Sequence, residues 1–490
     1  MSIRQQVTTA ALLGGSQPLL LEPSGSPLDS LLPALAKRDA SQRVLDAMAL
    51  VTAYEAAGGL PATAAQTPEP ATPDARARCS SMSSGHLAIL LTDRRGLLPE
   101  WLGLLHHSAR RPPEELIPAL LDAASSDKTL RERARTAAGP LGQWLAQFRE
   151  EWSWVLQASL DEAAWETGTL DERLALLKQL RPADPARARQ WVEATWSSES
   201  ADTKRQTIEA LAPLRSLDDE EFLESALNDR SIVVRRSAAE QLASLAGSKL
   251  SQRIFDRLAG RLQVKNTGLL GRTREIEVTP LESLDAAMTR DGIEKKPPSG
   301  SPLGERAWWT AQAIACIDPA RWTRELALSP EDLLHAAKNG QWHDLLLEGW
   351  QTAAIRYQSH DWLRVLAKKA RTADAGIFRA MAVADREAAL LQLLKQDART
   401  WLPLTVTYCQ HAWSPPFTQA VLRALDQHRP TGATDPLGYY LKPLLRSAAL
   451  LAAPEAASAP PDEIFGEFTD LVAFRRSMRQ ALTAHHQENR

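Results

Sequence analysis

The chain has 490 residues, of which 24% are charged and 44% are hydrophobic, and its formal net charge is -3. This balance is typical of a folded globular protein and excludes a chain that is disordered throughout. Because the charge is nearly neutral, it also argues against a surface built globally to bind a polyanion such as nucleic acid. The three cysteines, Cys79, Cys316 and Cys409, are odd in number and far apart, which argues against a disulfide framework and a zinc site. The N-terminus has no apolar run of signal-peptide length, so the expected location is the cytoplasm.

Apolar residues recur at helical spacing along most of the chain, and stretches rich in proline and small polar residues divide it. The expected segments are N-terminal helices over 1–60, a Pro/Ala/Ser-rich linker over 61–84, a helical region over 85–165, a repeat region over 166–262, an insertion or loop over 263–304, and a Trp-rich helical region over 305–490.

A period of thirty-one residues organises the repeat region. The cations Arg173, Lys204 and Arg235 recur at this interval, and several apolar positions keep the same phase. Self-similarity at such a period indicates stacked repeats, in which each unit buries its apolar face against its neighbours. Each unit is expected to form two antiparallel helices, over 231–245 and 251–262 in the third unit.

The segment 228–239 (NDRSIVVRRSAA) resembles a HEAT repeat, because Asp229, Val234 and Arg235 stand at the spacing of that motif. The resemblance implies an all-α fold with a HEAT-like α-solenoid core flanked by helical regions. It also implies a ladder of side chains that holds successive repeats together, which is a structural role. The ladder residues are Arg173, Lys204, Asp229 and Arg235.

The pattern changes after the repeats. Residues 264–278 contain an Asn-Thr-Gly break and then a stretch in which apolar and polar residues alternate. Alternation with a period of two predicts a strand, and a glycine-containing break favours a turn between two strands. A small β-hairpin is therefore expected near 264–278.

Nearly the whole chain resembles an uncharacterised bacterial family. The motifs that carry this resemblance are TAALLG at 9–14, WETG at 165–168, DER at 171–173, DP at 184–185, FLESAL at 222–227 with DR at 229–230, and GERAWW at 304–309. Members usually open with ALLGT, where this chain has Gly15 in place of the threonine. The family has no assigned catalytic residues, so the resemblance implies no catalytic site. Its members are often encoded beside a SWIM zinc-finger protein, a MoxR-type AAA+ ATPase and a von Willebrand factor A protein, which implies the last two as partners.

Motifs that would indicate chemistry are weak. No glycine-rich stretch is followed by the Lys-Ser/Thr of a phosphate loop, and no pattern has zinc-ligand spacing. His106-His107 and His485-His486 are adjacent pairs, which point about 100° apart on a helix and make poor joint ligands. Residues 83–86 (SSGH) are expected in a low-complexity loop without a paired acid. We therefore expect no catalytic residue, no metal site and no cofactor.

Charged clusters have a structural and a functional interpretation. The acidic run 218–221 (DDEE) is expected at the start of a helix, where carboxylates interact favourably with the positive helix end. Two basic clusters consist of Arg110, Arg111, Arg131, Arg133 and Arg135, and of Arg475, Arg476 and Arg479. Solvated helix faces are the favoured interpretation of both, and a surface that neutralises the phosphates of nucleic acid is the alternative.

Fifteen tryptophans are unusual beside five tyrosines and eight phenylalanines. Most are expected to be wedges between packed helices, because a buried indole removes much apolar area from water. Others are candidates for a partner surface in the C-terminal half. These candidates are Trp308, Trp309, Trp342, Trp350 and Trp362.

The favoured function is that of a non-enzymatic helical-repeat scaffold or adaptor, whose stacked helices bind protein partners. The alternative is a HEAT-like DNA-binding protein or DNA glycosylase, which the tryptophans favour and the net charge disfavours. A third hypothesis is a subunit needed only for the stability of a complex. No apolar stretch is long enough to suggest a membrane span.

Overall fold

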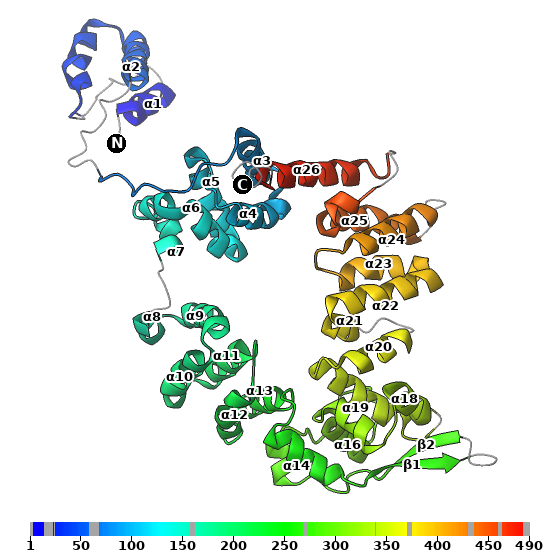
Figure 1. Ribbon diagram of the computed structural model, residues 1–490. Helices are drawn as coiled ribbons and strands as arrows, with labels where there is room; N and C mark the ends of the chain where they lie inside the picture. The colour runs from blue at the N-terminus through cyan, green and yellow to red at the C-terminus, as the bar shows by residue number, and fades with distance from the viewer. Residues whose placement is uncertain are drawn as a thin grey trace. The chain divides into compact units, whose positions relative to one another are not determined.

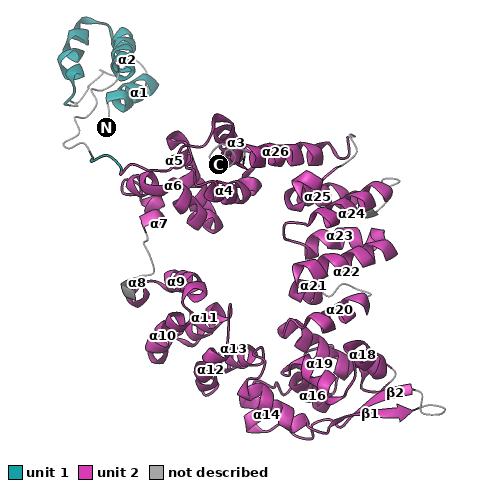
Figure 2. Ribbon diagram, viewed as in Figure 1, with its two compact units in different colours: residues 1–71 teal, residues 72–490 magenta. Residues whose placement is uncertain are grey.

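The computed structural model describes residues 3–13, 23, 25–57, 68–156, 162–267, 273–338, 340–369, 375–429, 436–458 and 463–483. Within these ranges the chain is predominantly helical, and its one sheet has two strands (Figure 1). The all-α class is therefore confirmed. The chain divides into two compact units, residues 1–71 and 72–490 (Figure 2), and the boundary falls inside the predicted linker.

Unit 1 is a small helical module. Its helices are α1 (Ile3–Leu13), the 3-10 helices η1 (Pro27–Ser30) and η2 (Leu32–Lys37), and α2 (Ala40–Ala56). The Asp39 side chain accepts a hydrogen bond from the Gln42 N–H at 2.9 Å and so caps the start of α2. Its small core contains Ile3, Val7, Leu28, Ala47 and Val51.

The first helices of unit 2 form a core of their own, called here the first core. They are α3 (Ser81–Thr92), α4 (Leu98–His107), α5 (Ile117–Ser126), α6 (Arg131–Ala146) and α7 (Ser153–Leu156). Ser80 caps α3 by accepting a hydrogen bond from the Ser83 N–H at 3.3 Å, and Leu87 and Leu90 of this helix are fully buried. Residues 83–86 thus lie in a helix and not in the expected loop. The cap and the buried leucines outweigh the serine-rich composition.

The predicted repeat region folds into a series of short helices. They are α8 (Glu162–Thr167), α9 (Leu170–Ala183), α10 (Pro185–Thr195), α11 (Ala201–Leu211), α12 (Glu220–Ala226), α13 (Ile232–Leu242) and α14 (Lys249–Leu258). Helices α9, α11 and α13 begin thirty-one residues apart, and α11 packs against both of the others. The sequence period therefore corresponds to a structural period.

Ion pairs join neighbouring repeats at the ladder positions. Arg173 Nη2 lies 2.5 Å from Glu199 Oε1, and Lys204 Nζ lies 2.8 Å from Asp229 Oδ2. In both pairs the cation is on the first helix of one repeat and the carboxylate precedes the first helix of the next. All four side chains are at least four-fifths buried, so salt screens these pairs less than pairs on an open surface.

Each of the first two ladder cations also lies over an indole ring. Arg173 Cζ is 4.3 Å from the centroid of Trp165, and Lys204 Nζ is 5.0 Å from that of Trp196. Such cation–π contacts contribute about 0.5–2 kcal/mol each. Arg235, the third cation, differs because it donates to two backbone carbonyl oxygens at 2.8 and 3.0 Å.

A buried ion pair holds the end of α9 against the segment before α12. Arg181 and Asp219 are 1% and 3% exposed, and Arg181 Nη2 lies 2.5 Å from Asp219 Oδ2. Arg189 lies 2.8 Å from Oδ1, and the Ser216 N–H donates to Oδ2 at 3.0 Å. Burial raises the pKa of the Asp219 carboxyl, but these hydrogen bonds outweigh burial, so the pKa lies below its ordinary value. Beyond the expected helix capping, the acidic run 218–221 therefore supplies a buried counter-charge.

The insertion contains the predicted hairpin. Strands β1 (Leu262–Thr267) and β2 (Thr273–Val278) pair antiparallel, with Val264 opposite Ile276. Ile276 and Val278 are buried on either side of the exposed Glu277, as a period of two requires. The hairpin is confirmed, and β2 packs against α18 (Pro330–Lys338).

The helices that follow share one core with the repeats, called here the second core, which runs from Trp165 to Val472. Besides α18, they are α15 (Ala286–Arg290), α16 (Glu305–Ala315), α17 (Pro319–Glu325), α19 (His343–Arg356), α20 (His360–Lys369), α21 (Ala375–Ala380), α22 (Val383–Gln396), α23 (Ala398–Tyr408), α24 (Pro415–Gln427) and α25 (Pro436–Leu451). The predicted boundaries at 262 and 304 are therefore not boundaries between cores.

The last helix, α26 (Gly466–Thr483), joins the two cores. Its Val472 belongs to the second core, whereas Met478 and Leu482 belong to the first. The helix packs against α25 and also against α3 and α4 (Figure 1). Unit 2 is thus closed by contact between its first and last helices.

Arg475 lies at the centre of this junction and is 2% exposed. Its Nε donates to Glu100 Oε2 at 2.7 Å, so the guanidinium of α26 pairs with a carboxylate of α4. Its Nη1 donates to the carbonyl oxygens of Ala449 and Ala452 at 2.8 and 2.7 Å. A single side chain of α26 therefore connects α4, which is 375 residues distant, to the end of α25.

The two neighbouring arginines take part in the same junction. Arg479 Nη2 lies 2.6 Å from Glu100 Oε1, and Arg476 donates to the carbonyl oxygens of Pro454 and Ala457. The interpretation of this cluster as a solvated helix face is therefore wrong. Its acceptors come from distant segments, which the spacing of the arginines on their own helix could not indicate.

We expect Glu100→Gln to lower the free energy of unfolding by about 3–5 kcal/mol, because it leaves the buried Arg475 without a counter-charge. Hydrogen exchange should also become faster in α26. The matched control is Glu325→Gln, which changes an exposed carboxylate on α17. If Glu100→Gln and Glu325→Gln had equal denaturation midpoints, Glu100 would not be the counter-charge that stabilises the buried Arg475.

We expect Asp219→Asn to destabilise the protein at neutral pH by a similar amount, about 3–5 kcal/mol. A carboxyl whose folded pKa is lowered stabilises the protein above its unfolded pKa, about 3.9, and this contribution disappears as the pH falls through the folded pKa. The difference in the free energy of unfolding between wild type and Asp219→Asn should therefore become smaller in acid. Denaturant titrations at neutral and acidic pH measure it, and a constant difference would show that the charge of Asp219 is not the cause.

Candidate functional site

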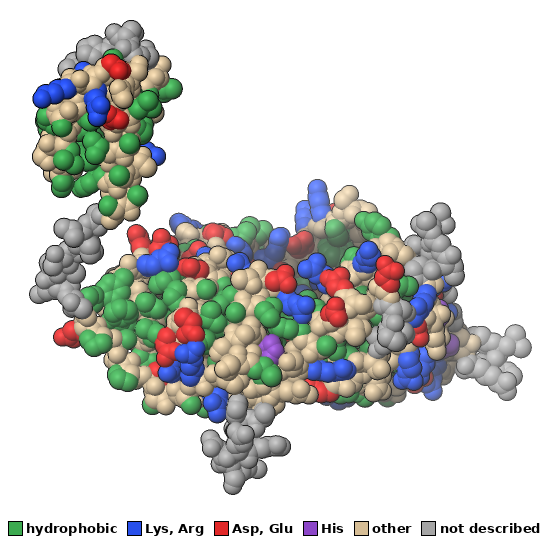
Figure 3. Space-filling model, turned by 90° about the horizontal axis from the view of Figure 1, so that it is seen from above, with side chains coloured by type: hydrophobic (Ala, Val, Ile, Leu, Met, Phe, Trp, Pro, Cys, Tyr) green, Lys and Arg blue, Asp and Glu red, His purple; other side chains and the backbone are tan. Residues whose placement is uncertain are grey.

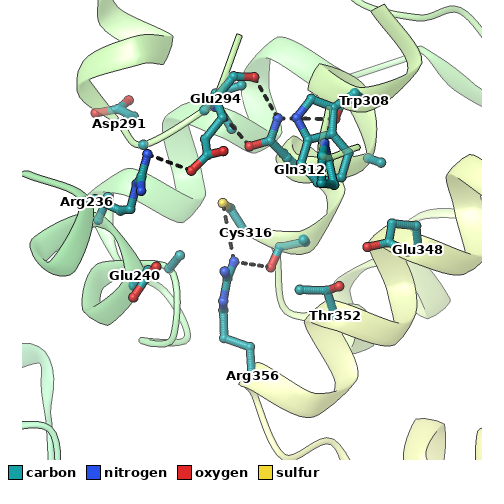
Figure 4. Close-up of a pocket in the computed structure, with 17 residues that line it drawn as sticks. Arg236, Glu240, Asp291, Glu294, Trp308, Gln312, Cys316, Glu348, Thr352 and Arg356 are labelled. Carbon is teal, nitrogen blue, oxygen red and sulfur yellow. Dashed lines mark hydrogen bonds and ion pairs between the residues drawn. The ribbon is translucent and has the colours of Figure 1, made fainter. Parts of the chain in front are cut away.

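A cavity between α13, α16 and α19 is the first candidate for a binding site. Its volume is about 360 Å³, and the segment 291–298 forms a further wall (Figure 4). This volume lies in the range of ligand pockets, about 300–1,000 Å³. Gly349 allows α19 to pack closely on α16, because a Cβ there would lie 2.8 Å from Ile314 Cγ2 and 2.9 Å from the carbonyl oxygen of Ala311.

Hydrogen bonds and ion pairs fix one wall of the cavity. Gln312 accepts from the Glu294 N–H at 2.9 Å and donates to the Glu294 carbonyl oxygen at 3.0 Å. The Glu294 carboxylate pairs with Arg236 at 2.8 Å (Figure 4). Asp291 is 1% exposed at its side chain and pairs with Arg253 and with Arg290. The segment 291–294 is therefore anchored on both sides, and its charges are neutralised.

Two further carboxylates remain for a ligand. Glu240 of α13 and Glu348 of α19 line the cavity from different helices, and both are exposed (Figure 4). Neither carboxylate forms a hydrogen bond or an ion pair with another residue in the described part of the chain. Trp308 also lines the cavity and is partly buried. The site thus offers two unpaired carboxylates and an indole, and the Arg356 guanidinium also lines it.

The floor of the cavity contains a thiol beside a guanidinium. Arg356 Nη1 donates to the Ala315 carbonyl oxygen at 2.8 Å and lies 3.6 Å from Cys316 Sγ. Burial raises the pKa of the Cys316 thiol, and the neighbouring Arg356 charge only partly opposes this effect. The thiol is therefore held neutral, as suits a packed cysteine and not a nucleophile.

The tryptophans proposed as a partner surface mostly serve the core. Trp309, Trp350 and Trp362 are 8%, 0% and 1% exposed. Buried side chains offer no surface to a partner, so this expectation needs correction for all three. Trp308 and Trp342 are partly buried, and of the five candidates only Trp308 lines the cavity. These three tryptophans are therefore buried between packed helices, as was expected for most tryptophans of the chain.

Of the ladder residues, Arg173, Lys204 and Asp229 form ion pairs between neighbouring repeats. Arg235 instead binds carbonyl oxygens just before its own helix, and none of the four lines the cavity. The acidic residues of the cavity were missed by sequence reasoning. Neither Glu240 nor Glu348 belongs to a motif in the sequence. The packing of α13, α16 and α19 brings both residues to the walls of one cavity, which no local pattern records.

The other sequence candidates are structural or dispersed. His86 Nε2 lies 3.1 Å from Ser477 Oγ, which links α3 to α26, and burial lowers the pKa of this imidazole. His485 and His486 lie outside the described residues. Within those residues, no group of three or more His, Cys, Asp or Glu side chains is arranged to hold a metal ion.

We expect none of the three cysteines to react quickly with an alkylating reagent at neutral pH in the folded protein. All three are buried, and burial raises the pKa of each thiol, that of Cys409 to about 12. Mass spectrometry after timed alkylation should find complete labelling only in denaturant. Rapid labelling of Cys316 in the native protein would instead indicate an accessible thiolate in the cavity.

No helix in the described ranges combines the length and the apolar character that a membrane crossing requires. Comparison with curated proteins and with solved structures finds no significant match. A family model matches residues 6–482, almost the whole chain. The resemblance to an uncharacterised family is confirmed at this level: the chain belongs to the family of unknown function DUF5691.

Proposed function

We propose that this chain is a cytoplasmic, non-enzymatic scaffold or adaptor with a HEAT-like α-solenoid core, and that the cavity between α13, α16 and α19 binds a basic segment of a protein partner. The observation that carries the proposal is the pair of unpaired carboxylates, Glu240 and Glu348, on two walls of one cavity. Three buried free thiols support a reducing compartment.

A Lys or Arg side chain suits this cavity for two reasons. Its head group can pair with Glu240 or Glu348, and its methylene groups can lie along apolar walls such as Ala239 and Ala311. The indole of Trp308 can add a cation–π contact. Because the carboxylates are exposed, such ion pairs add about 0–1 kcal/mol each and give specificity more than affinity.

The repeat contacts support the scaffold part of the proposal. In stacked repeats each unit depends on its neighbours, and the pairs Arg173–Glu199 and Lys204–Asp229 act between neighbours. The resemblance to the bacterial family implies which partners to test first, a MoxR-type ATPase or a von Willebrand factor A protein.

The DNA-binding alternative is less well supported. Arg475 and Arg479 of the C-terminal basic cluster pair with Glu100, and Arg476 is bound to carbonyl oxygens, so these cations already have protein partners. Figure 3 shows basic and acidic side chains interspersed on the face that it displays. A phosphate backbone favours continuous positive charge.

The test compares wild type, the double variant Glu240→Gln/Glu348→Gln and the control Glu325→Gln in binding to the purified ATPase and von Willebrand factor A protein. We expect the double variant to weaken the complex about tenfold and to reduce its salt dependence, and the control to behave as wild type. If neither protein binds wild type, and duplex DNA binds with a steep salt dependence, the adaptor proposal is wrong. If the double variant binds with the same affinity as wild type, the cavity is not the site that binds the partner.

A further inference from the structure

A second cavity lies on the first core, formed by α4, α6 and the extended segment before α3. Its volume is about 340 Å³. Leu102, Leu105 and Ala137, all buried residues of α4 and α6, line it on the inner side. Arg110, Arg133, His106 and His107 also line it, and they are partly or fully exposed. The cavity therefore combines apolar walls with a basic rim.

Two of the guanidinium groups at this cavity have no counter-charge. Arg110 donates to the Arg78 carbonyl oxygen at 3.1 Å, and Arg133 donates to the Pro99 carbonyl oxygen at 3.3 Å. Neither pairs with a carboxylate of any residue that the structure describes. A guanidinium has five N–H donors, so most donors of each group remain available.

The other charges at this cavity are neutralised in pairs. Arg76 Nη2 lies 2.6 Å from Asp74 Oδ2, and Glu132 Oε2 lies 3.3 Å from Arg135 Nη1. His107 Nδ1 lies 2.7 Å from the Gly103 carbonyl oxygen, which fixes its ring. The unpaired charge of the cavity is thus positive and comes from Arg110 and Arg133.

The remaining arginines of the same sequence cluster are occupied elsewhere. Arg111 pairs with Glu114 at 2.5 Å, and Arg131 lies over the Trp154 ring at 5.5 Å. Arg135, besides its contact with Glu132, donates to the Trp154 carbonyl oxygen at 2.9 Å. Three arginines of this sequence cluster therefore have structural contacts, whereas Arg110 and Arg133 line the cavity.

We propose that this cavity binds a small organic anion. The anionic group, a phosphate or a carboxylate, binds between Arg110 and Arg133, whose planar donor pattern matches both groups. The apolar part of the ligand lies along Leu102, Leu105 and Ala137. His106 and His107 contribute further ring nitrogens at the rim. This site is separate from the cavity between α13, α16 and α19 and does not depend on the adaptor proposal.

The probes are phenyl phosphate and benzoate, with benzyl alcohol as the uncharged control, titrated into the full-length protein by calorimetry. We expect saturable binding of at least one anion and much weaker binding of benzyl alcohol. Binding of phenyl phosphate but not benzoate identifies a phosphate site, and a second titration with inorganic phosphate measures how much the ring contributes. The absence of binding by both anions, or equal binding of benzyl alcohol, would overturn the proposal.

Substitutions test the assigned residues. Arg110→Gln and Arg133→Gln should each weaken binding of the anion about tenfold, because each removes a charge-assisted hydrogen bond. The matched control is Arg324→Gln, an exposed arginine of α17 outside the cavity, which should leave binding unchanged. Thermal unfolding of each variant checks that it folds. If folded Arg110→Gln and Arg133→Gln bind the anion as well as wild type does, these two arginines do not form the site.

Discussion

The arrangement of unit 2 depends on the hydrogen bonds and the ion pair of one buried guanidinium, that of Arg475. Arginine cannot lose its charge in a protein, so burying it requires acceptors that compensate for lost hydration. Glu100 supplies the opposite charge from α4, and the carbonyl oxygens of Ala449 and Ala452 supply neutral acceptors at the end of α25. These acceptors belong to different cores, so the guanidinium is satisfied only when the cores are held together by α26.

The repeats use charge in a different way. Arg173 and Lys204 each lie between a carboxylate that precedes the next repeat helix and an indole that precedes their own helix. The cations of these two sets of contacts lie thirty-one residues apart, which is the sequence period. The junction at Arg475 occurs once and has no period. Periodic ion pairs thus connect the helices of the repeat region, whereas a single long-range contact at Arg475 connects the two cores of unit 2.

The sequence predicted the features that depend on neighbouring residues. Alternation in 264–278 located the hairpin, and the thirty-one-residue period located α9, α11 and α13, because both patterns follow from local geometry. The role of Arg475 could not be predicted in this way, since its partner Glu100 is 375 residues distant. For the same reason, the cavity that Glu240 and Glu348 line could not be predicted from the sequence. Residues 83–86 were misassigned because buried neighbours, and not composition, decide the conformation of α3.

The position of α26 has a consequence for how the chain acquires its structure during synthesis. Domains generally fold in the order in which they leave the ribosome, the N-terminal ones first. Within unit 2 the helices from α3 to α7 are made first, but their core also includes Met478 and Leu482, which lie more than three hundred residues further along the chain. Its apolar surface under α26 therefore stays uncovered while more than three hundred further residues are added. Until α26 is made, this uncovered surface of the first core is open to chaperones and to aggregation.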